Sequence, residues 1–288
     1  MGQFGLAGPA LRRVQQAAES IFSALFPAEC RLCGELLLNI SALPVCAGCL
    51  RSIAAFDGPQ CRVCGERLLG QMPAGAEPHC GLCRRARPTY ERAFAIGPYD
   101  GALRDLIHLL KYQRMTPAAR PLGQALAAPL RAAMAEAGEQ AVLVPIPLYK
   151  GKRRQRSFNQ AEEIAREAVK AADVKVHIAP ELLERVRETV SQTGLTRHQR
   201  RQNVRGAFAV PKRFVRAVRS RNIIILDDVF TTGTTAEECA RVLRRAGAAK
   251  VWVVTAARVS KLEPAGTSLG HTLRKEQDTA ALGTAAAR

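Results

Sequence analysis

Residues 222–235 read NIIILDDVFTTGTT, and this stretch decides the fold class. Its opening run of isoleucine and leucine is typical of a strand buried on both faces of a parallel sheet. Two adjacent carboxylates and four threonines around one glycine come next. A helical pattern follows, with Ala236, Cys239, Ala240 and Leu243 on one face and Gly247 placed to end it. This order of strand, loop and helix predicts an α/β fold that binds a ligand at the carboxyl end of its sheet.

The loop after the strand suits a phosphate, because backbone N–H groups and the positive end of a helix converge there. Threonine hydroxyls add further donors. Asp227 and Asp228 would repel a phosphate, so we expect these carboxylates to bind vicinal sugar hydroxyls or a divalent cation. The segment is not a Walker A loop, since no Gly-Lys-Ser/Thr follows the glycine. The alternative is an ordinary strand–helix turn that is rich in threonine.

The same stretch resembles the phosphoribosyl-diphosphate (PRPP) signature of type I phosphoribosyltransferases. In that signature, four apolar residues, two acids and two apolar residues precede Thr-Thr-Gly-x-Thr. The resemblance implies that Asp227 and Asp228 hold the ribose hydroxyls of PRPP, directly or through Mg²⁺, and that the loop holds the 5′-phosphate. The loop residues are Thr231, Thr232, Gly233, Thr234 and Thr235.

Eight of the nine cysteines form four CxxC pairs. Each pair places two thiolates on one side of a tight turn, and two such knuckles complete a tetrahedral four-cysteine zinc site. We expect two structural zinc sites that fold a segment too small to hold itself, although the spacing also permits interleaved knuckles. The expected ligand sets are Cys30, Cys33, Cys46 and Cys49, and Cys61, Cys64, Cys80 and Cys83.

Disulfides and an iron–sulfur cluster are the alternatives to zinc. Disulfides need an oxidising compartment, whereas Arg12, Arg13 and Glu19 interrupt the start of the chain, which has no continuous apolar region of a signal peptide. An iron–sulfur cluster also uses four thiolates, but hairpin-sized loops favour zinc. His79 adjoins Cys80 and is expected to be a bystander. These features predict a cytoplasmic protein.

A second strand–loop–helix pattern presents arginines instead of carboxylates. Pro145-Ile146-Pro147 ends an expected strand, a basic cluster follows, and residues 156–160 read RSFNQ before a helical pattern. This arrangement is a plausible cradle for a diphosphate. Residues 183–208 are polar and rich in arginine, without a continuous apolar face over their middle. They predict either a mobile loop that closes over a charged ligand or a static surface loop.

Taken together, these features resemble the ComF family over nearly all of residues 20–258. The shared features are the cysteine knuckles, Tyr99 with residues 103–111, Pro-x-Pro with Arg-x-Phe-Asn-Gln, Arg-x-Arg-x-Thr-x-x-Gln at residues 185–192, and the PRPP signature. The resemblance implies N-terminal zinc ribbons, a phosphoribosyltransferase-like domain and a link to DNA uptake in natural transformation.

The resemblance also implies roles for particular residues. The segment with Arg156, Asn159 and Gln160 would bind the pyrophosphate of PRPP, which comes with Mg²⁺. Residues 185–192, with Arg185 and Arg187, would form a catalytic hood. Many relatives have glycine where this chain has Ser157, and a serine reaches positive φ only with strain.

The expected architecture is an α/β, parallel-sheet, type I phosphoribosyltransferase-like domain with a small N-terminal zinc-ribbon module. The expected divisions are a helical segment at residues 1–29, a double zinc ribbon at 30–88, the phosphoribosyltransferase-like domain at 89–260 and a disordered tail at 261–288. Residues 11–26 form an amphipathic pattern. No run of about 18 apolar residues exists, so no transmembrane helix is expected.

The hydrophobic pattern of the sequence also predicts the individual strands and helices. Strands are predicted at residues 93–97, 141–145, 174–178, 223–226 and 251–255. Helices are predicted at residues 105–111, 122–137 and 161–171.

The net charge of +18 is unevenly placed. Such fields attract polyanions such as pyrophosphate, PRPP or a nucleic-acid backbone, although a basic surface in solvent is the alternative. Only Phe158, Phe208 and Phe214 lie near these clusters in the sequence, so base stacking has thin support. One cluster holds Lys150, Lys152, Arg153, Arg154 and Arg156. The other holds Arg197, Arg200, Arg201, Arg205, Lys212, Arg213, Arg216, Arg219 and Arg221.

Three functions fit these observations. The first is a PRPP-binding phosphoribosyltransferase-like protein serving DNA uptake, in which Arg156 neutralises the charge on a leaving pyrophosphate. The second is a nucleic-acid-binding adaptor with a non-catalytic PRPP pocket, whose partners are single-stranded DNA and competence or DNA-processing proteins. The third is salvage of a free nucleobase.

Overall fold

The computed structural model describes residues 28–37, 41–69, 75, 77–190 and 196–260. The amphipathic stretch at residues 11–26 and the expected tail at 261–288 lie outside the described residues. The same holds for residues 191–195, which include part of the expected hood.

A five-stranded parallel sheet with the strand order β3-β9-β8-β4-β5 forms the centre of the fold. The predicted α/β fold with a parallel sheet is therefore confirmed. The strands are β3 (Ala93–Pro98), β4 (Val142–Pro145), β5 (His177–Ile178), β8 (Asn222–Phe230) and β9 (Lys250–Arg258).

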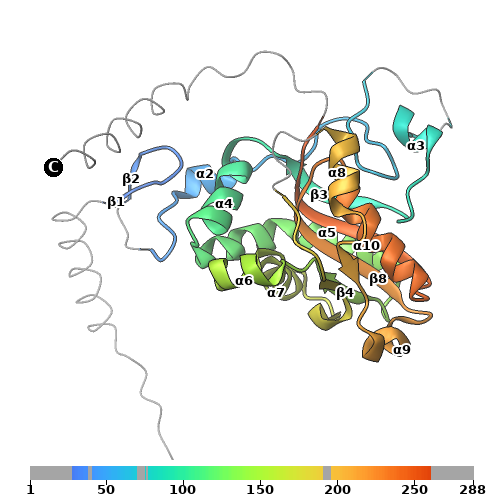
Figure 1. Ribbon diagram of the computed structural model, residues 1–288. Helices are drawn as coiled ribbons and strands as arrows, with labels where there is room; N and C mark the ends of the chain where they lie inside the picture. The colour runs from blue at the N-terminus through green and yellow to red at the C-terminus, as the bar shows by residue number, and fades with distance from the viewer. Residues whose placement is uncertain (1–27, 38–40, 70–74, 76, 191–195, 261–288) are drawn as a thin grey trace, which may run out of the picture.

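Helices cover both faces of this sheet (Figure 1). Helices α5 (Ala119–Ala137) and α7 (Gln160–Ala172) pack on one face, and α10 (Thr234–Arg245) packs on the other. Along β8, Ile224 and Leu226 join the first of these cores while Ile223 and Ile225 join the second. A continuous apolar run is the pattern that a strand buried on both faces requires.

Shorter elements complete the described chain. The helices are α2 (Ala47–Arg51), α3 (Gly81–Arg85), α4 (Gly101–Tyr112), α6 (Lys150–Arg156), α8 (Arg197–Val204) and α9 (Val215–Val218). The 3₁₀ turns are η1 (Thr116–Ala118), η2 (Pro180–Leu182) and η3 (Lys212–Phe214). Two antiparallel pairs join β1 (Ala28–Glu29) to β2 (Leu36–Leu37) and β6 (Glu184–Arg185) to β7 (Phe208–Ala209).

Strand β8 runs further than its apolar residues predict. Asp227 and Asp228 lie inside the strand, because its backbone stays paired with β9 up to Phe230. The same pairing extends β9 to Arg258. The two carboxylates are therefore fixed by the sheet itself and do not belong to the loop that follows.

Two basic segments that the sequence analysis assigned to loops are helical. Residues 150–156 form α6, and residues 197–204 form α8. A capping box explains α8: the Thr196 side chain accepts from the Gln199 backbone, and the Gln199 side chain accepts from the Thr196 backbone. The expectation of a loop was wrong over this segment, because local capping stabilises a helix that has no apolar face.

The cysteine-rich segment shares its core with the sheet domain. Cys30, Leu43 and Val45 belong to the same hydrophobic core as Ile96 and helix α5. The second cysteine group joins the opposite core, which includes α10. The first cysteine group thus packs against the core on one face of the sheet, and the second group packs against the core on the other face.

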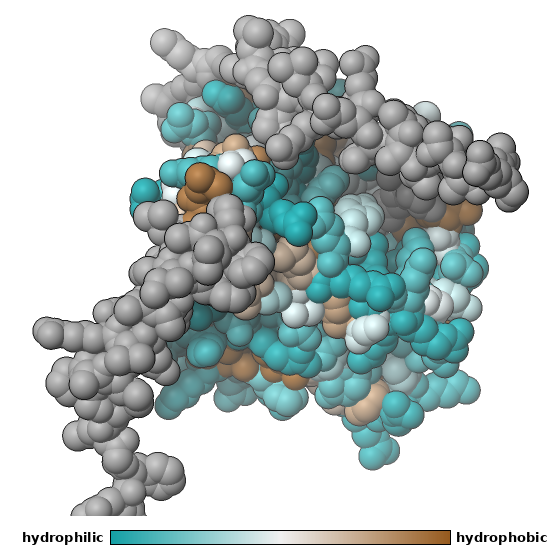
Figure 2. Space-filling model, turned by 90° about the vertical axis from the view of Figure 1, so that its left-hand side faces the viewer, coloured by the Kyte–Doolittle hydropathy of each residue, from teal (hydrophilic) through white to brown (hydrophobic). Residues whose placement is uncertain are grey.

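The helices of the described residues do not meet the requirements for crossing a membrane. Among the residues that the structure describes, no helix combines the length and the apolar character that a bilayer crossing requires. The face in Figure 2 is mainly hydrophilic, and its apolar residues form separate patches.

Gly123 on α5 permits the close approach of α7, since a Cβ atom there would lie 2.4 Å from Glu167 Cβ and 2.6 Å from the Glu167 carbonyl carbon. We expect Gly123→Ala to lower the free energy of unfolding by about 1–3 kcal/mol, because overpacked helices must move apart. Urea denaturation measures this change. Gly151→Ala is the matched control, because its Cβ would meet its nearest neighbour at 3.7 Å. There, alanine should leave the free energy unchanged or raise it by up to about 1 kcal/mol. Equal losses in the two variants would contradict the close contact.

Candidate functional site

A cavity of about 520 Å³ lies at the carboxyl ends of the parallel strands, where open α/β sheets bind their ligands. Three separate segments of the chain supply residues that the sequence analysis singled out. Those that line the cavity are Arg156, Gln160, Arg185, Asp227, Asp228, Thr231 and Thr235.

The threonine loop closes one end of this cavity. Gly233 has a φ of +75°, and a Cβ atom there would lie 2.6 Å from Phe230 Cζ. Glycine is required on both counts. Thr232 Oγ1 and Thr234 Oγ1 lie 3.1 Å apart. Helix α10 begins at Thr234, and its N-cap residue Gly233 has no side chain that could cap the helix.

The acid pair on β8 meets a lysine that the sequence analysis did not assign to the site. Lys111 Nζ lies 2.8 Å from Asp228 Oδ2, and Gln160 Nε2 donates to the same oxygen at 3.2 Å. The Asp228 backbone N–H donates to Asp227 Oδ1 at 2.9 Å. Side-chain exposure is 23% for Lys111 and 7% for Asp228, so this ion pair is shielded from water. Lys111 comes from the last turn of α4, more than 100 residues away from the acids in the sequence.

The two carboxylates titrate differently. Burial and the neighbouring charge of Asp228 raise the pKa of Asp227 to about 7. Burial also raises the pKa of Asp228, but the Lys111 ammonium outweighs it and holds this pKa below its ordinary value. Burial lowers the pKa of Lys111, and the charge of Asp228 outweighs that effect and raises it. Near neutral pH the site thus holds a charged Lys111–Asp228 pair beside Asp227, which keeps its proton to a higher pH than an ordinary aspartate.

Residues 156–160 form the basic side of the cavity. Arg156 Nη1 donates to Gln160 Oε1 at 3.2 Å, and its guanidinium lies 5.6 Å from the centroid of the Tyr112 ring. Asn159 does not line the cavity. Its Oδ1 accepts from the Ala161 backbone N–H at 3.2 Å and caps α7, while its Nδ2 donates to the Ile146 carbonyl at 3.1 Å. Asn159 therefore fixes the segment that carries its functional neighbours.

Ser157 ends α6 in the left-handed region, with a φ of +68°. This is the conformation that glycine adopts readily and that costs a serine about 1 kcal/mol or more. The strain anticipated at this position is therefore present. The Ser157 backbone N–H donates to the Arg153 carbonyl at 2.8 Å, which holds the turn between α6 and α7.

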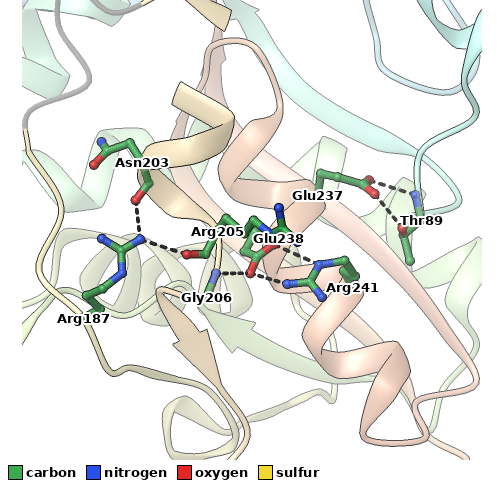
Figure 3. A network of polar contacts seen from close by, with 8 residues as sticks. All are labelled: Thr89, Arg187, Asn203, Arg205, Gly206, Glu237, Glu238 and Arg241. Carbon is green, nitrogen blue, oxygen red and sulfur yellow. Dashed lines mark hydrogen bonds and ion pairs between the residues drawn. The ribbon is translucent and has the colours of Figure 1, made fainter. Parts of the chain in front are cut away.

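The expected hood contains one arginine directed to the cavity and one that braces the chain. Arg185 on β6 hydrogen-bonds to Thr189 Oγ1 and lies 5.3 Å from the Phe208 ring centroid. Its Nε is buried without a hydrogen-bond partner among the described residues. Arg187 does not line the cavity. Its Nη2 donates at 2.8 Å to the carbonyls of both Asn203 and Arg205 (Figure 3).

Helix α10 anchors this hood and the end of the cysteine-rich segment (Figure 3). Glu238 accepts from the Gly206 backbone N–H at 2.7 Å and from Arg241 Nε at 2.9 Å. The adjacent Glu237 accepts from the Thr89 backbone N–H at 2.8 Å and from Thr89 Oγ1 at 2.6 Å. The helix that follows the threonine loop thus connects two segments that are distant in the sequence, one at Thr89 and one at Gly206.

The eight paired cysteines form two groups of four, in the sets expected from sequence, and each group could hold a metal ion. The Sγ–Sγ distances are 3.9 Å for Cys30–Cys49, 3.7 Å for Cys33–Cys46 and 3.6 Å for Cys64–Cys80. Tetrahedral zinc with Zn–S bonds of about 2.3 Å requires sulfur atoms about 3.8 Å apart, so both groups fit structural zinc. These distances are too long for disulfides. His79 belongs to neither group.

The two cysteine groups are built alike. In both groups, the backbone N–H of the first cysteine donates to the backbone carbonyl five residues later in the chain. Cys30 donates to Glu35 at 2.8 Å, and Cys61 donates to Glu66 at 2.7 Å. The second group also contacts the sheet through Arg258, whose Nη2 lies 2.7 Å from Glu66 Oε2 and 3.6 Å from Cys64 Sγ. A cationic side chain beside four thiolates offsets part of their negative charge.

Comparison of the sequence with known proteins identifies the family of this chain. The chain is 32% identical to competence protein F of Haemophilus influenzae over 225 residues, which cover 77% of this chain and 93% of that protein. It is 31% identical to DNA utilization protein YhgH of Salmonella typhimurium over 229 residues, which cover 79% of this chain and 95% of that protein. The chain belongs to the ComF family.

No family model matches the chain. DNA utilization protein YhgH of Escherichia coli is 32% identical over 176 residues, 60% of this chain and 75% of that protein. Among solved structures, the PRPP amidotransferase of B. subtilis matches with a TM-score of 0.32 and 22% identity, over 49% of this chain and 26% of that chain. A hypoxanthine phosphoribosyltransferase of Staphylococcus aureus matches with a TM-score of 0.29 and 15% identity, over 51% of this chain and 67% of that chain.

We expect this ComF-family chain to copurify with two zinc ions, because it has two four-cysteine groups with tetrahedral spacing. Metal analysis of reduced, chelator-free protein measures the ratio. Cys64→Ser should lose one ion and also destabilise the sheet domain, since Cys64 packs in the same core as α10. Cys239→Ala, which changes the ninth and fully buried cysteine, should keep both ions. One ion or none in the unmodified protein would contradict the assignment.

The raised pKa of Asp227 predicts a pH-dependent stability. In the unfolded chain the pKa returns to about 3.8, so the folded state binds the proton more tightly and stability falls as pH rises from about 4 to about 7. Asp227→Asn removes this loss. Its thermal midpoint should exceed that of the unmodified protein by a few degrees at pH 8, with an advantage that grows from pH 4 to pH 7. Glu139→Gln, at an exposed carboxylate, is the control and should show a constant offset. An equal advantage at every pH would argue against a raised pKa of Asp227.

Proposed function

We propose that this ComF-family chain binds PRPP in the cavity at the carboxyl ends of the sheet and transfers its phosphoribosyl group. One observation carries the proposal: the threonine loop with the acid pair, Arg156 and Arg185, from three segments of the chain, line a single cavity. A phosphate cradle, a hydroxyl-binding acid pair and a basic rim are the three parts that such a ligand requires.

The proposed ligand lies along the cavity in three sections. The 5′-phosphate accepts hydrogen bonds from the loop of residues 231–235 and the first N–H groups of α10. The ribose hydroxyls donate to Asp227 and Asp228. The pyrophosphate pairs with Arg156 and with Arg185, whose buried Nε needs an acceptor. Gln160 lies between these sections, since it contacts both Arg156 and Asp228.

The proposed reaction is a displacement at the anomeric carbon of PRPP. The bond from that carbon to the pyrophosphate oxygen breaks, the leaving pyrophosphate takes both electrons, and the acceptor nucleophile forms the new bond and loses its proton. Arg156 and Arg185 would offset the charge that grows on the leaving group. Mg²⁺ bound to the pyrophosphate would supply further charge neutralisation. Arg187 would keep the hood folded over the ligand through the carbonyls that it binds.

The biological setting of the proposal comes from the relatives. The names of the relatives, competence protein F and DNA utilization protein, refer to competence and DNA use. We place the chain in the same process, DNA uptake in natural transformation, with other competence or DNA-processing proteins as partners. Eight thiolates kept as zinc ligands suit a reducing compartment, so the proposed location is the cytoplasm.

Ligand-linked stability tests the PRPP proposal. PRPP with Mg²⁺ should raise the thermal midpoint of the unmodified protein by several degrees. Combined Asp227→Asn and Asp228→Asn should abolish that rise, because amides lack the charge that strengthens hydrogen bonds from ribose hydroxyls. The matched control combines Glu139→Gln with Asp173→Asn, which neutralise two exposed acids and should keep the full rise. An undiminished rise in the first double variant would place the ligand elsewhere.

A second candidate function, binding of single-stranded nucleic acid, rests on a feature that only the structure reveals. Tyr112 is 62% exposed beside the cavity, with its ring 5.1 Å from that of His108 and 5.6 Å from the Arg156 guanidinium. Lys152 and Arg200 line the same cavity. An exposed aromatic ring among basic side chains is the combination that single-strand binding uses.

Salt dependence tests the nucleic-acid candidate. Affinity for a single-stranded oligonucleotide should fall steeply with salt, because phosphate contacts release counterions. Replacing the exposed Arg201, Arg205 and Arg213 by alanine should weaken binding for all sequences and flatten the log–log slope by up to about 2. The control replaces the exposed Arg120, Lys170 and Lys250, which removes the same charge from other surfaces and should leave the slope unchanged. Fluorescence polarisation measures both. Salt-insensitive or sequence-specific binding would remove the basis of this candidate.

A further inference from the structure

We infer that Lys111 is the resident cation of the acid pair Asp227–Asp228, so that the protein's own ammonium stands where a divalent cation would otherwise bridge these carboxylates and the ribose. The inference concerns the acid pair itself. It bears on the proposed PRPP site but has a test that does not require PRPP to bind.

Two of the four oxygens of the acid pair accept hydrogen bonds from the protein itself. Asp228 Oδ2 accepts from Lys111 Nζ at 2.8 Å and from Gln160 Nε2 at 3.2 Å. Asp227 Oδ1 accepts from the Asp228 backbone N–H at 2.9 Å. Mg²⁺ demands near-octahedral oxygen ligands at about 2.1 Å and gives up its waters reluctantly. An ammonium in contact with the same oxygen would repel that ion at close range and in a shielded site.

The fold fixes Lys111 in this position. The apolar face of α4 buries Leu103, Leu106, Ile107 and Leu110, which sets the rotation of the helix and directs its last turn at the sheet. A cation is also favoured at the carboxyl end of a helix. The side chain is 23% exposed, so the ammonium is held at the edge of the cavity rather than in bulk water.

The surrounding charges make Lys111 the suitable partner for the pair. Arg156 also acts on Asp228, but Lys111 acts on it more strongly, both by charge and by hydrogen bonding. Lys152, Arg185 and Arg200 also line the cavity, and Lys111 Nζ is the ammonium in direct contact with Asp228 Oδ2, at 2.8 Å. The buried Asp228 carboxylate would be costly without a cation, and Lys111 offsets that cost before any ligand arrives.

This arrangement has a consequence for the proposed ligand. The ribose hydroxyls would meet carboxylates whose charge is already offset, and Mg²⁺ would be confined to the pyrophosphate section. Binding of the sugar-phosphate part should then be independent of divalent cations. Binding of whole PRPP can still respond to Mg²⁺ through its pyrophosphate.

Binding of Mn²⁺, a paramagnetic substitute for Mg²⁺, tests the inference on the zinc-loaded full chain without any sugar ligand. Electron paramagnetic resonance should detect no Mn²⁺ bound to the acid pair of the unmodified protein. The double variant Asp227→Asn with Asp228→Asn should therefore bind as much Mn²⁺ as the unmodified protein. Lys111→Met should create such a site, with affinity about tenfold or more above the unmodified protein. Lys111→Arg keeps the charge and should not. Lys152→Met removes another cavity-lining charge and should also leave the acid pair without Mn²⁺.

Each result of this titration decides the inference. An acid-dependent Mn²⁺ site in the unmodified protein would overturn it, and this measurement stands even where Lys111→Met fails to fold. Equal Mn²⁺ binding by folded Lys111→Met and by the unmodified protein would overturn it as well. Zinc content and far-ultraviolet circular dichroism identify the folded variants.

Ribose 5-phosphate, which lacks the pyrophosphate, provides the second measurement. The unmodified protein should bind it equally well in magnesium-free buffer and in Mg²⁺, whereas Lys111→Met should bind about tenfold more weakly without Mg²⁺ and recover with it. A strong Mg²⁺ requirement in the unmodified protein would overturn the inference. Failure of the unmodified protein to bind PRPP or ribose 5-phosphate under any condition would overturn the proposed function instead, while the Mn²⁺ titration still decides the role of Lys111.

Discussion

Two adjacent carboxylates in the central strand of a sheet that is buried on both faces are the constraint on which the rest of the site depends. Strand β8 is apolar up to Leu226 and then presents Asp227 and Asp228 while its backbone remains paired with β9. A buried carboxylate without partners is costly. Lys111 and Gln160 supply the compensating donors, and they come from helices on the same side of the sheet as α5. The position of α4 is therefore part of the chemistry of the site.

Helix α10 has a comparable role on the opposite face. It begins at the threonine loop, and its first two turns carry Glu237 and Glu238. One carboxylate holds Thr89 at the end of the cysteine-rich segment, and the other holds Gly206 at the base of the hood. Both contacts are charge-assisted hydrogen bonds. A displacement of the threonine loop would therefore also move Thr89 and Gly206. The cysteine-rich segment and the cavity are thus parts of one packed structure.

Much of the site could be predicted from sequence because its signals are local. The strand, the two acids, the threonine loop and the following helix are consecutive, and each CxxC pair encodes its own turn. Lys111 and Tyr112 could not be placed in this way, since only the packing of α4 brings them to β8. Helix α8 was missed although Thr196 and Gln199 form a capping box, which is a readable signal. The lengths of β8 and β9 were underestimated because backbone pairing continues where the apolar pattern stops.

The charge along the cavity explains why a sugar that carries anions at both ends suits it. One end offers backbone N–H groups and threonine hydroxyls, the other offers Arg156 and Arg185, and the middle holds carboxylates offset by Lys111. PRPP has this pattern of anion, neutral sugar and anion. A single strand of nucleic acid repeats the same pattern along its backbone, and the exposed Tyr112 ring lies where a base could stack. The two proposed ligands therefore share one physical basis. The cavity volume of about 520 Å³ favours the smaller one, because it lies in the range of small-molecule sites.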